Sequence, residues 1–151
     1  MNAITLRRFI LCLILLLLTF PAPAGPLEDA NKKIVLDFFN LAFNQHQPAE
    51  AARKYLGPEY IQHNPYAANG PGAFSAFFES YFRSNPNYHV TIARMIAEGD
   101  LVVVHSNAKS DPAGRGTAVV DILRVENGRI VEHWDVVQAV PSMSANTNSM
   151  F

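Results

Sequence analysis

The sequence predicts an α+β fold, in which three N-terminal helices pack on one face of a cone-shaped, curved antiparallel sheet. Three observations support this prediction: apolar residues recur at helical spacing between residues 27 and 84, they alternate with polar residues from 88 to 139, and an Asn-Gly pair divides the last two alternating runs. Helices followed by consecutive strands are typical of the α+β class. Because sheets twist, such a sheet curls around its helices and leaves a pocket at the open end.

The helical half contains three segments. Residues 27–44 and 73–84 each carry a broad apolar face, and the second face is rich in phenylalanine, including Phe78. Residues 48–55 begin at a proline, which suits the first turn of a helix. A short extended segment at 60–63 and Gly/Pro loops follow. The phenylalanines of residues 73–84 are expected in the core, since aromatic side chains dominate protein interiors, and contact with a ligand is the alternative.

The second half predicts strands at 88–97, 101–109, 116–126 and 129–139. Gly99-Asp100 and Asn127-Gly128 are expected to form tight turns, the second of type I′. The tail at 141–151 is rich in serine, asparagine and methionine, and we expect it to fray.

Length, charge and the N-terminus restrict the function further. The chain has 151 residues, which suits one domain, and a net charge of −1, which argues against a nucleic-acid-binding protein with a basic face. An arginine pair precedes an apolar run at 9–20, and an Ala-x-Ala cleavage pattern ends at Ala24. The alternative, a membrane anchor, needs roughly 20 apolar residues, and this run ends before Pro21.

We therefore expect a signal peptide at 1–24, a single domain at 25–151, and a periplasmic or secreted location. No stable membrane association is expected after cleavage. Cleavage also removes the one cysteine, so the core alone must hold the fold together.

The register of the last strands sets which side chains meet. A two-residue turn at 127–128 places Asp121 opposite Trp134, and closure of the 110–116 loop places His105 opposite Asp121. A β-bulge would exchange the two faces. An apolar wall raises the pKa of a carboxyl group and a nearby imidazolium lowers it, so such a carboxylate can take a proton from a carbon next to a carbonyl. Two alternatives stay open: Asp121 on a solvated face, and His105 as a structural histidine.

Other polar residues carry weaker signals. His63 and Asn64 are expected at the mouth of the pocket, although the asparagine alternatively caps a local turn. His133 and Asp135 have the same-face spacing of metal ligands. Without a third ligand at a recognisable spacing, a salt bridge with Arg124 or a subunit contact is favoured, and we predict no metal.

Two segments resemble a known family. Tyr60-Ile61-Gln62-His63-Asn64-Pro65 and residues 121–138, with the sequence DILRVENGRIVEHWDVVQ, are similar to the SnoaL-like branch of the nuclear-transport-factor-2-like superfamily, which includes polyketide cyclases and enzymes labelled as aldol-condensation type. The resemblance implies a conical fold with a deep apolar pocket, commonly dimeric through the sheet. It also implies that Asp121 acts as acid and base beside His105, without a metal or organic cofactor.

The leading hypothesis is an exported, cofactor-independent lyase or isomerase, which acts on a small apolar carbonyl compound. Asp121 and His105 would be catalytic. The residues expected to shape the substrate site are Tyr60, His63, Asn64, Phe78 and Trp134. The rival hypotheses are a non-catalytic module that binds a small ligand and a module that dimerises or binds a partner through its sheet.

Overall fold

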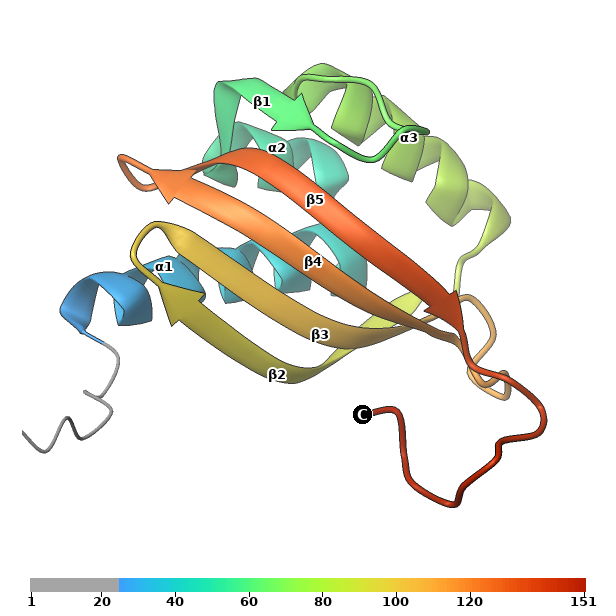
Figure 1. The fold of residues 1–151 in the computed structure, drawn as a ribbon. Coiled ribbons are helices and arrows are strands. Elements are labelled where there is room, and N and C mark those ends of the chain that lie inside the picture. The colour runs from blue at the N-terminus through green and yellow to red at the C-terminus, as the bar shows by residue number, and fades with distance from the viewer. Residues whose placement is uncertain (1–24) are drawn as a thin grey trace, which may run out of the picture.

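The computed structural model describes residues 25–151, and the predicted signal peptide at 1–24 lies outside the described residues. Three helical regions come first along the chain (Figure 1). They are α1 (Pro26–Phe39), which continues as the π-helical turn η1 (Asn40–Asn44), α2 (Pro48–Tyr55) and α3 (Pro71–Ser84). The predicted helices are confirmed. No helix within the described range combines the length and apolar character that a membrane crossing needs.

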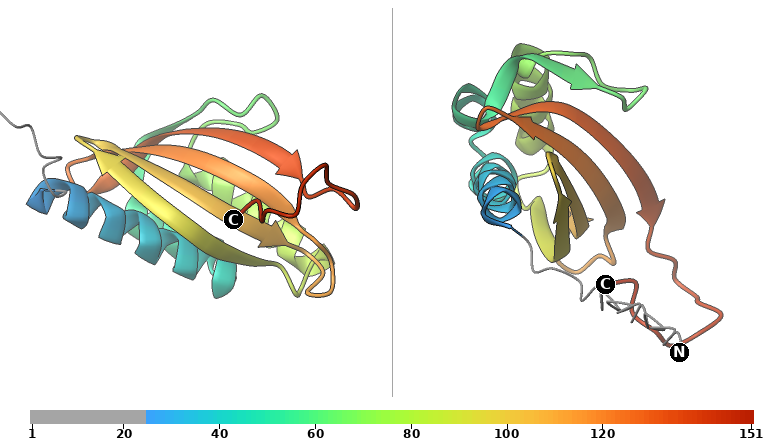
Figure 2. Two further views of the ribbon diagram at one scale, coloured as in Figure 1. Left: turned by 60° about the horizontal axis from the view of Figure 1, so that its bottom comes forward. Right: turned by 60° about the vertical axis from the view of Figure 1, so that its left-hand side comes forward.

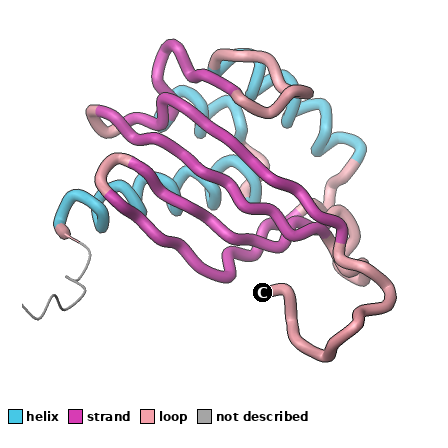
Figure 3. The backbone as a smooth tube through the Cα atoms, in the orientation of Figure 1, coloured by secondary structure: helices cyan, strands magenta, loops and turns pink. Residues whose placement is uncertain are grey.

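Five strands form one sheet in the order β1-β5-β4-β3-β2 (Figure 3). They are β1 (Leu56–Gln62), β2 (His89–Glu98), β3 (Leu101–Lys109), β4 (Thr117–Glu126) and β5 (Arg129–Ala139). The α+β class is confirmed, but the sheet is not wholly antiparallel, since β1 pairs with β5 in the parallel direction. The reason is that the extended segment at 60–63 begins four residues earlier than predicted and joins the edge of the sheet.

The helices cover one face of the sheet, and the sheet curves over them (Figure 2). Val35, Phe38 and Phe39 of α1 recur at helical spacing and are buried against Val104 of β3 and Leu123 of β4. The apolar stripe of the sequence therefore forms the core. Beyond this core, residues of the helices and of the concave face of the sheet line a pocket.

Two hydrogen bonds from one asparagine side chain join the end of the first helical region to β2. The Asn44 side chain accepts a hydrogen bond from the Val90 backbone N–H at 2.9 Å and donates one to the Val90 carbonyl at 3.1 Å. A π-helical turn adds one residue to the helical repeat, and such turns are frequent at functional sites. Here the turn carries Phe43 into the aromatic wall described below.

A β-bulge overturns the predicted register between β4 and β5. Next to the turn the pairing is as predicted, with Glu126 opposite Arg129. Between Arg124 and Val125 the register shifts, because Val131 is an extra residue in β5. Gly57 of β1 makes room for it, since a Cβ there would lie 2.9 Å from Val131 Cγ1.

The shift corrects two expectations. Asp121 lies opposite Asp135 rather than Trp134, so His133 and Asp135 share its concave face and Trp134 points outward. The β3–β4 pairing also closes one residue earlier than predicted, and Asp121 lies opposite Val104 instead of His105.

The chain after β5 has no helix or strand and returns to the outer face of the sheet (Figure 2). The ring of Phe151 stacks on His105, with ring centroids 5.6 Å apart. The expectation that this tail frays stays a prediction.

Candidate active site

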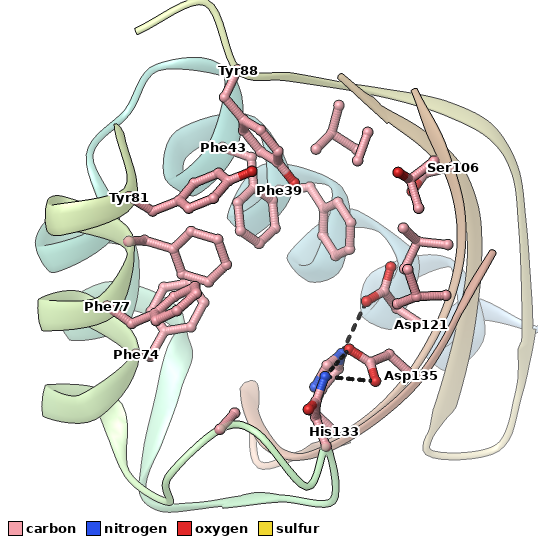
Figure 4. A pocket seen from close by; sticks show the side chains of 18 of the residues that line it. Phe39, Phe43, Phe74, Phe77, Tyr81, Tyr88, Ser106, Asp121, His133 and Asp135 are labelled. Atoms are coloured by element: carbon pink, nitrogen blue, oxygen red, sulfur yellow. Dashed lines mark hydrogen bonds and ion pairs between the residues drawn. The ribbon is translucent and has the colours of Figure 1, made fainter. Parts of the chain in front are cut away.

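A cavity of about 880 Å³ lies between the helices and the concave face of the sheet (Figure 4). Its helical wall is aromatic and consists of Phe39, Phe43, Phe74, Phe77, Phe78, Tyr81 and Tyr88. Its sheet wall carries the polar groups Gln62, Asn64, Ser106, Asp121, His133 and Asp135. A pocket with an apolar body and a few convergent polar groups is typical of a small-molecule site.

Asp121 and His133 form the centre of the polar wall. Each side chain belongs to a residue only 9% exposed, and Asp121 Oδ1 lies 2.9 Å from His133 Nε2. Adjacent strands bring them together because the bulge turns His133 to the concave face. Burial raises the pKa of Asp121, the hydrogen bond and charge of His133 lower it, and the charge of Asp135 raises it; the pKa is raised overall.

Gln62 determines which ring nitrogen of His133 carries a proton. Its Oε1 is 2.7 Å from His133 Nδ1 and also accepts a hydrogen bond from the Asn64 backbone N–H at 3.3 Å. A backbone N–H only donates, so this atom is the amide oxygen and His133 Nδ1 carries a proton. Nε2 therefore shares one proton with Asp121, as either carboxyl and neutral imidazole or carboxylate and imidazolium.

Asn64 hydrogen-bonds to Asp135, the second carboxylate of the polar wall. Its Nδ2 lies 3.0 and 2.8 Å from the two oxygens of Asp135, and its Oδ1 accepts the Tyr66 backbone N–H at 2.8 Å. The two interpretations of Asn64 in the sequence are thus compatible, since one side chain both caps a turn and reaches the pocket.

The same carboxylates and imidazole have the composition of a divalent-cation site. Donor atoms of Asp121, His133 and Asp135 all lie within 4.8 Å of one another. The sequence offered no third ligand beside His133 and Asp135, because the predicted register placed Asp121 on the other face. A cation at this position would replace the proton that Asp121 and His133 share.

The remaining predicted site residues divide between the two faces. Tyr60 and Phe78 line the cavity. Trp134 lies on the outer face, where the His63 ring stacks on it with centroids 4.5 Å apart, and His63 Nε2 is 2.8 Å from Glu132 Oε1.

The prediction that His105 supports Asp121 is wrong, and His133 takes that place. Arg94 Nη1 donates to His105 Nδ1 at 2.8 Å on the outer face. The spacing of His133 and Asp135 predicts a shared face, but the predicted register places that face away from Asp121. Gln62 is a site residue that the sequence does not single out.

The family model of the SnoaL-like domain matches residues 35–133. The chain belongs to this family. The match begins in α1 and ends at His133, so it includes the aromatic wall, Asp121 and the segment with Gln62 and Asn64. No curated protein matches the chain in sequence.

Solved structures agree with this assignment. A candidate SnoaL-like polyketide cyclase from Jannaschia sp. CCS1 is 21% identical with a TM-score of 0.65, over 77% of this chain and 90% of that one. TsrD from Streptomyces laurentii is 23% identical with a TM-score of 0.61, over 72% and 88%. A candidate ketosteroid isomerase from Kribbella flavida is 16% identical with a TM-score of 0.64, over 79% and 85%. At these identities the likeness shows the fold of the SnoaL-like domain, and its chemistry must be argued from its own site.

Proposed function

We propose that this SnoaL-like protein is a cofactor-independent acid/base enzyme of the lyase or isomerase type. It would move a proton at a carbon next to the carbonyl of a small apolar molecule. The observation that carries the proposal is the buried Asp121 carboxyl, hydrogen-bonded to His133 at 2.9 Å and facing an aromatic cavity. The fold that the chain shares with candidate cyclases and a candidate isomerase supports the same reaction type.

The proton transfer uses the carboxylate–imidazolium form of the pair. His133 donates Nε2–H to one oxygen of Asp121, which favours the ionised form of the carboxylate against the opposing effect of burial. The other oxygen takes the proton from the substrate carbon, and the electron pair of the broken C–H bond moves into the carbonyl to form an enolate. Asp121 then returns the proton to another carbon in an isomerase. In a lyase it returns the proton to the oxygen or carbon at which a bond breaks or forms.

The test is hydrogen–deuterium exchange at the carbon next to the carbonyl of small aromatic ketones. Asp121→Asn is expected to slow exchange on the order of 100-fold or more. The matched control is Asp100→Asn, which removes an exposed carboxylate in the β2–β3 turn and is expected to leave the rate unchanged. Undiminished exchange in Asp121→Asn would remove Asp121 from the mechanism. Ligand recovered unchanged and in stoichiometric amount, by mass spectrometry, would instead identify a binding module.

We also propose that the protein acts after export, in the periplasm or outside the cell, and as a homodimer. The N-terminal arginine pair and apolar run support export. The outer face of the sheet supports the dimer, since Ile96 is 63% and Val136 is 71% exposed there. Light scattering of wild type and Val136→Lys tests the dimer, which the lysine is expected to weaken.

A further inference from the structure

We propose that the pocket selects a neutral ligand with two separate oxygen functions, and that Ser106 and Tyr88 bind the second oxygen through their hydroxyl groups. This inference rests on the proposed function, in which the first oxygen belongs to the carbonyl beside the carbon that Asp121 deprotonates. It adds two binding residues and a restriction on the charge of the ligand.

Ser106 is a buried hydroxyl group that faces the cavity. The residue is 1% exposed, and its side chain points from β3 into the hollow (Figure 4). Asn107 Oδ1 is the one sealed side-chain atom without a partner among residues 25–151, so Ser106 Oγ is not such an orphan and can be reached from the cavity that the residue lines. A ligand oxygen that reaches this hydroxyl gains a hydrogen bond at a site largely removed from bulk water.

The position of Ser106 relative to Asp121 suits a single ligand. In the β3–β4 register Ser106 lies opposite Val119, and Asp121 lies opposite Val104. The two side chains are therefore diagonal neighbours on one face of the sheet, at a separation that a compact molecule spans. One molecule can place an oxygen at Ser106 while its reactive carbon lies at Asp121.

Tyr88 supplies a second hydroxyl from the aromatic wall. Its ring is partly buried and its oxygen points into the cavity (Figure 4). Burial raises the pKa of the phenol, so the group remains protonated and able to donate. Tyr81 differs, because its hydroxyl lies 2.8 Å from Ser110 Oγ and already has a partner. The two tyrosines thus form a matched pair for a test.

The charge of the lining favours a neutral ligand. Asp111, Asp121 and Asp135 line the cavity, and among the described lining residues there is no lysine or arginine. The His133 imidazolium of the reactive form is already paired with Asp121, so a carboxylate ligand would be desolvated beside like charges without a free cation to pair with. The aromatic wall favours a ring-bearing molecule, because rings pack against rings by stacked and edge-to-face contacts.

Isothermal titration calorimetry with three naphthalenes tests the inference. They are 2-acetylnaphthalene, with one oxygen function, 6-acetyl-2-naphthol, with two, and the anion of 6-acetyl-2-naphthoic acid. We expect the naphthol to bind wild type about five- to tenfold more tightly than acetylnaphthalene, as one additional hydrogen bond allows. The naphthoate is expected to bind more weakly than both.

The variants assign the difference to the two hydroxyls. Ser106→Ala and Tyr88→Phe are each expected to reduce the preference for the naphthol, whereas Tyr81→Phe keeps it. An unchanged preference in Ser106→Ala, tight binding of the naphthoate, or failure of all three naphthalenes to bind would overturn the inference. Deuterium exchange of acetylnaphthalene separates the two proposals, because this ketone lacks the second oxygen. Wild type is expected to exchange it whether or not the inference on the second oxygen holds, and Asp121→Asn is expected to lose that exchange.

Discussion

Gln62 Oε1 accepts a hydrogen bond from His133 Nδ1 at 2.7 Å, and this contact joins the edge strand β1 to the acid–imidazole pair on the central strands. It fixes the proton on the outer ring nitrogen and leaves the inner nitrogen for Asp121. Gln62 is therefore a positioning residue, which acts on the substrate only through His133.

The first prediction concerns this contact. Gln62→Leu keeps the size of the side chain but removes the acceptor, so we expect the maximal exchange rate to fall roughly tenfold or more, with little change in KM. Gln62→Glu restores an acceptor and is expected to recover most of the rate. The control is Gln138→Leu, at an exposed position of β5. A change in KM alone would contradict the positioning role.

The second prediction concerns the pH dependence of stability. The pKa of Asp121 is raised from its ordinary value of 3.8, so the native state holds this proton at a pH where the unfolded chain has lost it. The free energy of unfolding should therefore decrease as pH rises from about this ordinary value to the raised pKa, and then level off. Urea unfolding of wild type and Asp121→Asn across this pH window isolates the contribution of Asp121 to the free energy of unfolding. A stability advantage of wild type over Asp121→Asn that grows with pH across this window would contradict the assignment.

The third prediction concerns the bulge. Gly57→Ala places a methyl group against Val131 Cγ1, and we expect it to lower the free energy of unfolding by about 1–3 kcal/mol, as overpacking does. Gly72→Ala is the matched control, because a Cβ there meets no atom within 4 Å. Val131→Ala is expected to rescue Gly57→Ala in the double variant. Equal stability of Gly57→Ala and Gly72→Ala in urea would show that the close approach is unimportant.

The fourth prediction concerns metals. The proposed reaction needs only the shared proton, so dialysis against EDTA should leave deuterium exchange unchanged. Added Zn²⁺ should inhibit, because binding to Asp121, His133 and Asp135 displaces that proton. Loss of activity on dialysis that Zn²⁺ or Mn²⁺ restores would instead assign the cluster as a metal centre.

The sequence predicted most of the fold because its signals are local. The helical spacing of Val35, Phe38 and Phe39 lies within one turn, and the hairpin turn needs only Asn127 and Gly128, whose φ angles of 51° and 75° are both positive. The start of β1 was missed because Pro58 weakens a strand prediction. Proline is tolerated there because β1 lies at the edge of the sheet.

The site was predicted only in part, because it depends on contacts between distant segments. Asp121 was identified from its apolar neighbours, but its partner depends on whether β5 contains an extra residue. Val131 is a β-branched residue typical of a regular strand, and the room for its bulge comes from Gly57, more than seventy residues earlier. A change of one residue in register turns every following side chain to the other face, which is why His133 rather than Trp134 reaches the pocket.

The outward position of Trp134 provides an intrinsic optical probe. It is the one tryptophan of the chain, it follows His133 directly, and its indole is stacked on the ring of His63. A movement of β5 that accompanies ligand entry would alter this stacking on the convex side. The fluorescence of the unlabelled protein would report such a movement in real time, without a dye and without any change to the residues that line the cavity.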